Sequence, residues 1–479
     1  MTRTHEADVV VIGSGPGGAT TAALLAEAGR DVLLVEEGHH WTLDSAPSYS
    51  LAEMDQKYRN GGLNTTFGKT NITYVEGRCV GGGSEVNAGL YHRPLTTTLQ
   101  AWRDRFQIEN FDPEELWPFF EAVERDFSVS RFPNGPGPSS LTLRAGADKL
   151  GWKTAEIQRF WKYSAAANPS PPSGRRQSMT ETMIPRALAA GARILADTIV
   201  TRLHWKGSRA TGATGRTQWN GSKQLVELRF RELFVCAGAV QSPLLLRRSS
   251  LTRHIGDSLR LHPMVRVVAA FDKPVNDPAW GVPVEQIEEF KPELTLGCSH
   301  SSIPHLALWM GGEGPVRRDR LRRYDHAGVY YVAAVGTGQG KVRDLPVLHE
   351  PIVRLPLTPQ DLDRLGEGLY RLGQALFAAG AKEISHPVEG EAPIRAAGEL
   401  DRLRSGLPQG RMSVSTIHLF SSIPMGEDAS QCAVDSFGKL HGFDNVRVND
   451  GSILPLSPGV NPQGTILALA RRNAERFLG

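Results

Sequence analysis

Close to the N-terminus, two apolar runs are separated by a glycine-rich turn and a helix-forming segment. Residues 9–12 and 32–35 are apolar without alternation, which is typical of strands that are covered on both faces. Between them, residues 19–28 are rich in strong helix formers and end before Gly29, a residue common just after a helix. The pattern therefore predicts a strand, a turn, a helix and a second parallel strand within about 30 residues.

The turn after the first predicted strand carries a dinucleotide-binding pattern. Gly13, Gly15 and Gly18 fit the spacing G-x-G-x-x-G, which permits a tight turn, close approach of the backbone to a pyrophosphate and close packing of helix on strand. Glu36 follows the second strand, where its carboxylate can bind a ribose and repel a 2′-phosphate. A glycine-rich turn without a ligand is the alternative. The complete order of elements instead predicts a bound adenine dinucleotide, either FAD or NAD.

Glycine, proline and serine mark further irregular segments. Residues 76–89 read EGRCVGGGSEVNAG, which is too rich in glycine for a stable helix. This segment is either a long loop or backbone that packs directly against a flat ligand. The preceding residues 39–74 are irregular and indicate an excursion over the surface or over a site. Clusters of Pro, Gly and Ser at residues 132–140 and 165–174 predict exposed loops.

The middle of the chain is predicted to be rich in strands. Residues 192–203 and 224–235 have strand-like patterns, with a glycine-bearing segment at 207–215 between them. Residues 265–355 mix short apolar runs with turns, which suits an antiparallel sheet, and residues 357–379 have helical periodicity. An α/β start is therefore followed by a region of antiparallel character.

A second informative block lies near the C-terminus. It contains His418, the segment VRVNDGS at residues 446–452, and the segment GVNPQGT at residues 459–465, which leads into a final helix starting near Thr465. The N-terminus of this helix offers free N–H groups and positive potential. Its predicted apolar face consists of Ile466, Leu467, Leu469, Ala470 and Phe477.

Length and composition limit the function classes. A chain of 479 residues can hold two or three domains, since about 150 residues is a common domain size. The net charge of +3 does not favour nucleic acid or an anionic membrane as the main partner, and the basic run 316–323 is interpreted as a solvated face. Four widely spaced cysteines predict neither a disulfide scaffold nor a metal site, and Cys236 is interpreted as an inert core residue.

The apolar runs also bear on localisation. None reaches the roughly 18 residues that a membrane helix needs. The first predicted strand begins so close to Met1 that no signal peptide would fit before it. The sequence thus predicts a cytoplasmic protein with no integral membrane segment.

Taken together and in this order, these blocks resemble the glucose–methanol–choline (GMC) family of FAD-dependent oxidoreductases. The similarity covers the N-terminal fingerprint, the loop GRCVGGGSEVN, the segment CAGAVQSPLLL and the C-terminal block. It implies a Rossmann-like FAD-binding domain of the GMC and p-hydroxybenzoate hydroxylase type, with a discontinuous antiparallel-sheet substrate domain (α/β plus α+β). The FAD-binding domain would comprise residues 5–44, 76–94, 178–264 and 430–479, and the substrate-binding domain with its cap loops residues 45–75, 95–177 and 265–429.

The resemblance also implies which residues bind FAD. Val200 would lie beside the adenine through its backbone. Val86 stands where some relatives have a histidine that binds FAD covalently, so non-covalent FAD is expected. The other expected residues are Gly13, Gly15, Gly18 and Glu36 for the ADP half, Gly77, Gly81, Gly83 and Asn87 for the flavin, Asp450 and Gly451 for the pyrophosphate or ribityl chain, and Pro462, Gln463 and Thr465 at the last helix.

The reaction implied by the resemblance is oxidation of a CH–OH group to an aldehyde or ketone, with hydride transfer to flavin N5. His418 would act as general base because imidazole titrates near neutral pH, and Asn461 would hydrogen-bond the substrate oxygen. The alternative for His418 is a histidine satisfied by neighbouring Ser and Thr groups; the position of Asn461 before the last helix argues against it. The dipole of that helix would stabilise negative charge on the reduced flavin. Structural roles are expected for His92, His262 and His441.

Several alternatives stay open at this level. Leu419 and Phe420 stand where relatives often carry a Gly/Cys-rich run, and they either narrow the pocket or reflect another substrate. The expected partners are a small-molecule alcohol (a sterol, sugar, amino sugar, aryl or aliphatic alcohol) and oxygen or another electron acceptor, as in an alcohol oxidase or an alcohol dehydrogenase. The main alternative function is a non-redox GMC-type lyase that keeps FAD structurally and cleaves a cyanohydrin.

Overall fold

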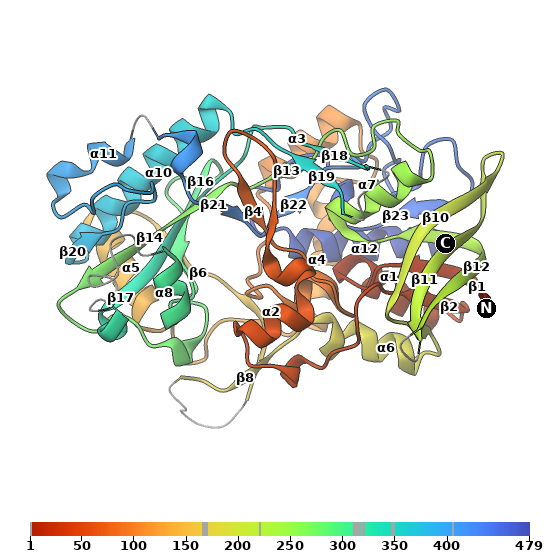
Figure 1. Ribbon diagram of the computed structural model, residues 1–479, viewed down its shortest axis with the longest axis horizontal. Helices are drawn as coiled ribbons and strands as arrows, with labels where there is room; N and C mark the ends of the chain where they lie inside the picture. Colours follow the sequence, from red (N-terminus) through yellow and green to blue (C-terminus); the bar gives the residue numbers. More distant parts are fainter. Residues whose placement is uncertain are drawn as a thin grey trace.

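The computed structural model describes residues 2–164, 171–219, 222–309, 318, 321–345, 350–404 and 407–479. Two large sheets, each with its own helices, lie toward opposite ends of an elongated molecule (Figure 1). Both chain termini lie at the end that holds the first sheet (Figure 1). The arrangement confirms the expected fold class, a Rossmann-like α/β part combined with an antiparallel-sheet part.

The first sheet has a parallel centre and an antiparallel extension. It consists of β1 (Thr2–Ile12), β2 (Val32–Val35), β9 (Arg193–Leu195), β10 (Thr198–Lys206), β11 (Arg209–Trp219), β12 (Ser222–Val235) and β23 (Val446–Val448). The strand order is β10-β11-β12-β1-β2-β9, with β23 paired to β12. The pairs β1–β12, β1–β2, β2–β9 and β12–β23 are parallel, whereas β10–β11 and β11–β12 are antiparallel.

Helices from distant parts of the chain pack together beside this sheet. They are α1 (Pro16–Glu27), α4 (Pro113–Asp126), α6 (Met183–Ala189), α7 (Gly238–Arg248) and α12 (Gln463–Leu478). Helix α1 contacts both α6 and α12, α12 contacts α4, and α7 contacts β10. The C-terminal helix is therefore brought next to the N-terminal fingerprint, which α1 follows.

Close packing around the fingerprint excludes side chains at two glycines of α1. A Cβ on Gly17 would lie 1.9 Å from the carbonyl oxygen of Asn449, and a Cβ on Gly18 would lie 1.9 Å from that of Gly13. Gly13 has φ +96°, in the left-handed region that favours glycine. The spacing of glycines in this turn is thus required by the packing of β1, α1 and the segment after β23.

The second sheet is mainly antiparallel. It consists of β3 (Asn64–Thr65), β4 (Ile72–Tyr74), β6 (Thr154–Glu156), β14 (Met264–Phe271), β15 (Glu285–Ile287), β16 (Leu294–Cys298), β17 (Ala327–Ala334), β20 (Ala381–Ile384) and β21 (Val414–Thr416). The order is β3-β4-β21-β14-β17-β16-β15-β6, with β20 paired to β14. Only the β4–β21 pair is parallel among the pairs described.

The central strands β14 and β17 have two different faces. Val265, Val267 and Val332 point into a hydrophobic core that also contains side chains of α5 (Pro138–Lys149) and α10 (Pro359–Ala378). Since side chains alternate along a strand, Met264 and Tyr331 point the other way, and both line a cavity. One face of the sheet therefore stabilises the fold, and the other is available for a ligand.

Shorter elements connect these parts. The remaining strands are β5 (Val129–Ser130), β7 (Arg159–Tyr163), β8 (Gly174–Arg176), β13 (Arg260–Leu261), β18 (Lys341–Arg343), β19 (Ile352–Arg354) and β22 (Leu419–Phe420). Further helices are α2 (Leu51–Lys57), α3 (Thr96–Phe106), α8 (Ile303–Trp309) and α11 (Asp401–Arg404). In the ranges that the structure describes, no helix combines the length and the apolar character that crossing a membrane requires.

The prediction of an exposed loop at residues 132–140 holds only in part: residues 132–137 form no helix or strand and residues 133–134 are exposed, but residues 138–140 belong to a helix. Helix α5 begins at Pro138, a favoured first helical residue, and Gly137 precedes it. Ser139 and Ser140 are buried; the Ser139 hydroxyl donates to the carbonyl oxygen of Val275, and the Ser140 hydroxyl accepts from the N–H of Val284. Residues 165–170 of the other expected loop, and residues 316–317 and 319–320 of the basic run, lie outside the described residues.

Residues 192–203 form two strands rather than one, and the glycine-bearing segment is itself a strand. The chain turns between β9 and β10 at Asp197, which has φ +52°. Strand β11 contains Gly212 and Gly215, where a Cβ would lie 2.7 Å from the Leu228 carbonyl oxygen and 2.4 Å from the Ile199 carbonyl oxygen. These glycines mark close strand contacts, not a loop.

Candidate functional site

A single cleft collects segments from both ends of the chain. Its lining includes the fingerprint turn, the glycine-rich loop, the start of α7 and the start of α12. A smaller cavity adjoins it on the open face of the second sheet, and Ala88, Leu90, Ile417, His418 and Asn461 line both spaces. The cleft is lined by residues 12–17, 35–37, 59, 75–77, 82–83, 86–90, 198–200, 236–239, 241, 244–245, 248, 417–419, 450–451, 461–463 and 466.

The fingerprint end of the cleft is joined by one buried hydrogen-bond network. Glu36 accepts from the backbone N–H of Ser14 (3.0 Å), the hydroxyl of Ser14 (2.7 Å) and the N–H of Gly38 (2.9 Å). The Ser14 hydroxyl in turn accepts from the N–H of Gly81 (3.1 Å). Burial raises the pKa of Glu36, while these donors act in the opposite direction. The network fixes the acid, the turn and the glycine-rich loop relative to one another.

The glycine-rich loop leaves open space where a flat ligand would pack. Gly83 is exposed to the cleft, and a Cβ on it would meet no atom within 4 Å. A Cβ on Gly15 would meet only the Cα of Gly82, at 4.0 Å. Gly77 is different, because its Cβ would lie 2.3 Å from the carbonyl oxygen of Gly82. Backbone without side chains therefore forms a cradle, and the residues present fit a dinucleotide that lies against it.

A methyl group at Gly83 should weaken cofactor binding without disturbing the fold. We expect Gly83→Ala to lower the affinity for FAD by about 5- to 150-fold, which corresponds to roughly 1–3 kcal/mol of overpacking. Titration of the apoprotein with FAD, followed by flavin fluorescence, measures this. Gly398→Ala is the matched control, because Gly398 is exposed and also has open space around its Cβ position. Equal FAD affinity in the two variants would contradict the cradle.

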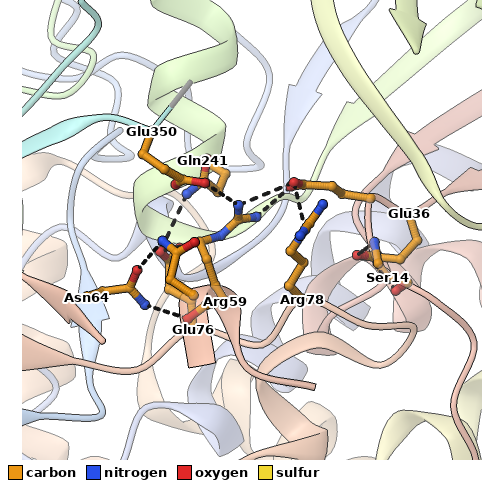
Figure 2. Close-up of polar contacts among 11 residues, drawn as sticks. Ser14, Glu36, Arg59, Asn64, Glu76, Arg78, Gln241 and Glu350 are labelled. Carbon is orange, nitrogen blue, oxygen red and sulfur yellow. Dashed lines mark hydrogen bonds and ion pairs between the residues drawn. The ribbon is translucent and has the colours of Figure 1, made fainter. Parts of the chain in front are cut away.

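A buried ion cluster borders the same cleft (Figure 2). Arg59, which is 5% exposed, pairs with Glu37 at 2.5 Å and with Glu350 at 3.2 Å, and its Nε lies 3.8 Å from Glu76. Gln241 of α7 donates to Glu76 at 3.4 Å. Burial raises the pKa of Glu76 to about 7, although the charge of Arg59 works against this rise. The cluster links the end of β2, the excursion at residues 39–74 and α7.

Asp450 fixes the start of α7 and the short 3₁₀ turn Gly451–Ile453 at the cleft. Its carboxylate accepts from the N–H of Gly238 (2.8 Å) and the hydroxyl of Ser242 (2.5 Å). It also accepts from the N–H (2.8 Å) and the hydroxyl of Ser452. Asp450 thereby positions the first turn of α7 and Gly451, and it lines the cleft itself.

His418 and His262 form a direct pair at the junction of the cleft and the cavity. The antiparallel β13–β22 pair aligns Leu261 with Leu419, so the residues next to them, His262 and His418, face each other. Their Nδ1 atoms are 3.0 Å apart, and His262 Nε2 lies 2.5 Å from the hydroxyl of Ser457. Sequence patterns assigned His262 a structural role; the structure places it in contact with the candidate base.

The two imidazoles are held neutral. Burial lowers the pKa of His418 to about 4, with a further contribution from the charge of Arg266. Burial and the neighbouring His418 lower the pKa of His262 well below its ordinary value. A neutral imidazole has one protonated and one free nitrogen, so His418 can accept a proton at neutral pH.

Asn461 and the start of α12 complete this part of the cleft. The helix begins at Gln463, two residues before the expected start, and its first N–H groups have no acceptor within the helix. Asn87 donates from its side chain to Gln463, which joins the glycine-rich loop to the helix. These N–H groups and the helix dipole supply positive potential at this point.

All but three of the predicted catalytic and cofactor-binding residues line the cleft. Gly18 packs against the carbonyl group of Gly13 and the side chain of Cys236, and Gly81 packs against the side chain of Glu85, and neither glycine lines the cleft. Thr465 lies within the first turn of α12 and is buried, and its hydroxyl has no hydrogen-bond partner among the described residues. The other predicted residues, His418, Asn461, Gly13, Gly15, Glu36, Gly77, Gly83, Asn87, Val200, Asp450, Gly451, Pro462 and Gln463, all line it.

Comparison with known protein families shows that two models of the GMC oxidoreductase family match this chain. The N-terminal GMC oxidoreductase model matches residues 54–264, and the C-terminal GMC oxidoreductase model matches residues 340–470. A model for NAD(P)-binding Rossmann-like domains matches residues 11–62. The matched residues include the fingerprint, the glycine-rich loop, His418 and Asn461.

Individual relatives extend over nearly the whole chain. An uncharacterised GMC-type oxidoreductase of Sinorhizobium fredii is 40% identical and covers 99% of this chain and 95% of its own. A long-chain-alcohol oxidase of Arabidopsis thaliana is 25% identical over 97% of this chain and 67% of its own. Among solved structures, pyridoxine 4-oxidase from Mesorbium loti has a TM-score of 0.76 at 20% identity, over 98% of this chain and 99% of its own.

Proposed function

The chain belongs to the GMC oxidoreductase family and its cofactor is FAD, and from this premise we propose that it oxidises a CH–OH group of a small-molecule alcohol to an aldehyde or ketone. The observation that carries the proposal is the pair of His418 and Asn461 at the junction of the FAD cleft and the adjoining cavity. The long-chain-alcohol oxidase among the relatives supports the same reaction class.

His418 acts as the base in this proposal, and His262 sets its tautomer. Only one of the facing Nδ1 atoms can carry the proton of the hydrogen bond. If His418 Nδ1–H donates to His262, the Nε2 of His418 is free to accept the proton of the substrate hydroxyl. His262 Nε2–H then donates to Ser457, whose hydroxyl also accepts from the N–H of Gly459 at 3.1 Å. The Ser457–His262–His418 chain of hydrogen bonds therefore holds His418 in the tautomer whose Nε2 can accept the substrate proton.

The remaining residues orient the substrate and the cofactor. When bound, FAD supplies the acceptor for the hydride that leaves the carbinol carbon. Asn461, which lines the same cavity as His418, would hydrogen-bond the substrate oxygen. The free N–H groups at the start of α12 stabilise negative charge that develops in the cleft. Val86 lines the cleft without a nucleophilic atom, which supports non-covalent binding of FAD at this position.

The pKa of His418 predicts a specific pH dependence. Only the neutral imidazole accepts a proton, and the pKa of His418 is lowered to about 4, so activity is lost as the pH falls through this value and not before. We expect the ratio of the flavin reduction rate to the substrate dissociation constant to be flat from about pH 5 to 8 and to fall below about pH 4. Stopped-flow mixing at each pH measures it. A decrease centred near the ordinary imidazole pKa of about 6.5 would contradict the assigned environment.

Product analysis tests the reaction class directly. The holoenzyme is supplied with an artificial two-electron acceptor and a panel of alcohols, and carbonyl product is quantified against acceptor reduced. One aldehyde or ketone for every two electrons supports the proposal. Carbonyl release from a cyanohydrin with no acceptor reduced would instead identify the non-redox lyase.

A further inference from the structure

An arginine stands on the open face of the second sheet. Arg266 on β14 lies between Tyr331 on β17, its cross-strand partner, and Ser415 on β21. Met264 and Tyr331 share this face, so the guanidinium lines the cavity that adjoins the FAD cleft. His418, which follows β21 by two residues, lines the same cavity.

Arg266 has no anionic partner within the part of the chain that the structure describes. One guanidinium nitrogen donates to the hydroxyl of Ser415, and the group lies over the ring of Trp309, 5.0 Å from its centroid. No carboxylate of the described residues forms an ion pair with it. Burial lowers the pKa of Arg266 to about 10, which leaves it charged at neutral pH. Because an uncompensated charge in a mostly apolar cavity is costly, the presence of Arg266 there indicates a ligand that supplies the negative charge.

The cavity contains further neutral groups that suit an anion. The hydroxyl of Tyr331 accepts from the side-chain amide of Gln286 at 2.7 Å, which leaves its own proton free to donate. Ser299 and Thr295 also line the cavity, whose other walls are mainly apolar. A guanidinium with several free N–H groups presents the planar fork that matches a carboxylate.

We propose that Arg266 binds a carboxylate of the substrate, so that the alcohol oxidised at His418 is a hydroxy acid. This inference rests on the proposed alcohol oxidation. His418, Asn461 and Arg266 line one cavity. In this inference the hydroxyl of the substrate contacts His418 and Asn461, and the carboxylate of the same molecule contacts Arg266. Neutralisation of Arg266 by the bound carboxylate also removes a positive charge that acts on His418, which makes His418 a stronger base in the complex.

The test uses matched acids and amides on the holoenzyme. The reducing probes are 3-hydroxypropionate, 4-hydroxybutyrate and 4-(hydroxymethyl)benzoate, each compared with its neutral amide. The unreactive probes are acetate, butyrate and benzoate with their amides, and their binding is followed by the change in flavin absorbance. We expect at least one acid of each series to bind wild type roughly 10- to 100-fold more tightly than its amide, which corresponds to charge-assisted hydrogen bonds.

Two substitutions separate binding from folding. Arg266→Met should raise the dissociation constant of the acid by roughly 10- to 100-fold and change that of the amide by less than about twofold, while Arg266→Lys keeps part of the preference. In Arg266→Met the low-pH loss of activity should also move to higher pH, because the charge that lowers the pKa of His418 is gone. FAD content, measured after purification, reports whether each variant is folded.

The outcomes distinguish this inference from the proposed function. If neutral alcohols reduce the flavin but no acid binds more tightly than its amide, the carboxylate site is wrong and alcohol oxidation stands. If acids bind in an Arg266-dependent way but no alcohol reduces the flavin, the anion site stands and the proposed function is wrong. Equal losses for acids and amides in Arg266→Met would assign Arg266 a structural role and overturn the inference.

Discussion

Replacement of His418 by Ala should slow flavin reduction by about 10²- to 10⁴-fold, the usual size of a general-base effect. The neutral imidazole is the group best placed to take the hydroxyl proton, because its Nδ1 lies 3.0 Å from that of His262 and, in the proposed tautomer, its Nε2 can accept a proton. FAD should stay bound, since neither the cradle at Gly15 and Gly83 nor the carboxylate of Glu36 involves this side chain. Anaerobic stopped-flow mixing with a reducing alcohol measures the rate constant.

Two comparisons make the result specific to His418. His204→Ala removes an exposed histidine of β10 that lines neither the cleft nor the cavity, and it should leave the rate unchanged. His262→Phe, which breaks the bond to His418 without removing the base, should lower the rate less than His418→Ala and leave FAD content unchanged. A His418→Ala variant that reduces at the wild-type rate would show that the base lies elsewhere.

Replacement of Arg59 by Met should lower the free energy of unfolding by about 3–5 kcal/mol, the cost of breaking a buried ion pair. The variant leaves Glu37 and Glu76 without the cation that lies between them, and both carboxylates are largely buried. Arg78, 2.9 Å from Glu37, compensates in part. Urea unfolding of the holoenzyme at constant FAD concentration measures the change.

The pH dependence of this variant separates a lost charge from lost packing. Burial raises the pKa of Glu76 to about 7 even with Arg59 present, and the charge of Arg59 opposes this rise. Loss of Arg59 therefore raises the pKa of Glu76 further, so that the carboxyl is protonated and uncharged at pH 6. The destabilisation should therefore be smaller at pH 6 than at pH 8. Arg229→Met is the control, because the Arg229–Glu227 pair is exposed and should change the free energy of unfolding by less than about 1 kcal/mol. A loss at Arg59 that is as small as at Arg229 would rule out the buried pair.

Local patterns were sufficient to predict which segments meet at the fingerprint end of the cleft. The fingerprint and the glycine-rich loop need glycine where the backbone turns sharply or packs closely, and Glu36 follows a buried strand directly. Such requirements leave short, recognisable patterns in the sequence. In the structure they converge through short contacts such as Ser14 with Glu36 and Gly81. The start of α12 was placed to within two residues for the same reason, since Asn461 and Pro462 precede it directly.

The residues that the sequence did not reveal depend on pairing between distant strands. His262 meets His418 only because Leu261 pairs with Leu419, and no local pattern encodes that register. Arg59 lies in the irregular excursion after β2, where nothing distinguishes it from a surface arginine. Arg266 did leave a signal, because it is a lone charge in the apolar strand MVRVVAAF, but its meaning depends on which face of the sheet is open.

Anaerobic flavin bleaching is the measurement that tests the central claim most directly. The purified yellow protein is mixed without oxygen with a panel of alcohols that includes hydroxy acids, and the loss of flavin absorbance is followed. Our account predicts that at least one alcohol bleaches the flavin, that its carbonyl product appears in equal amount, and that the rate of recolouring in air then distinguishes an oxidase from a dehydrogenase. Reduction by dithionite but by no alcohol, together with cleavage of a cyanohydrin, would contradict it.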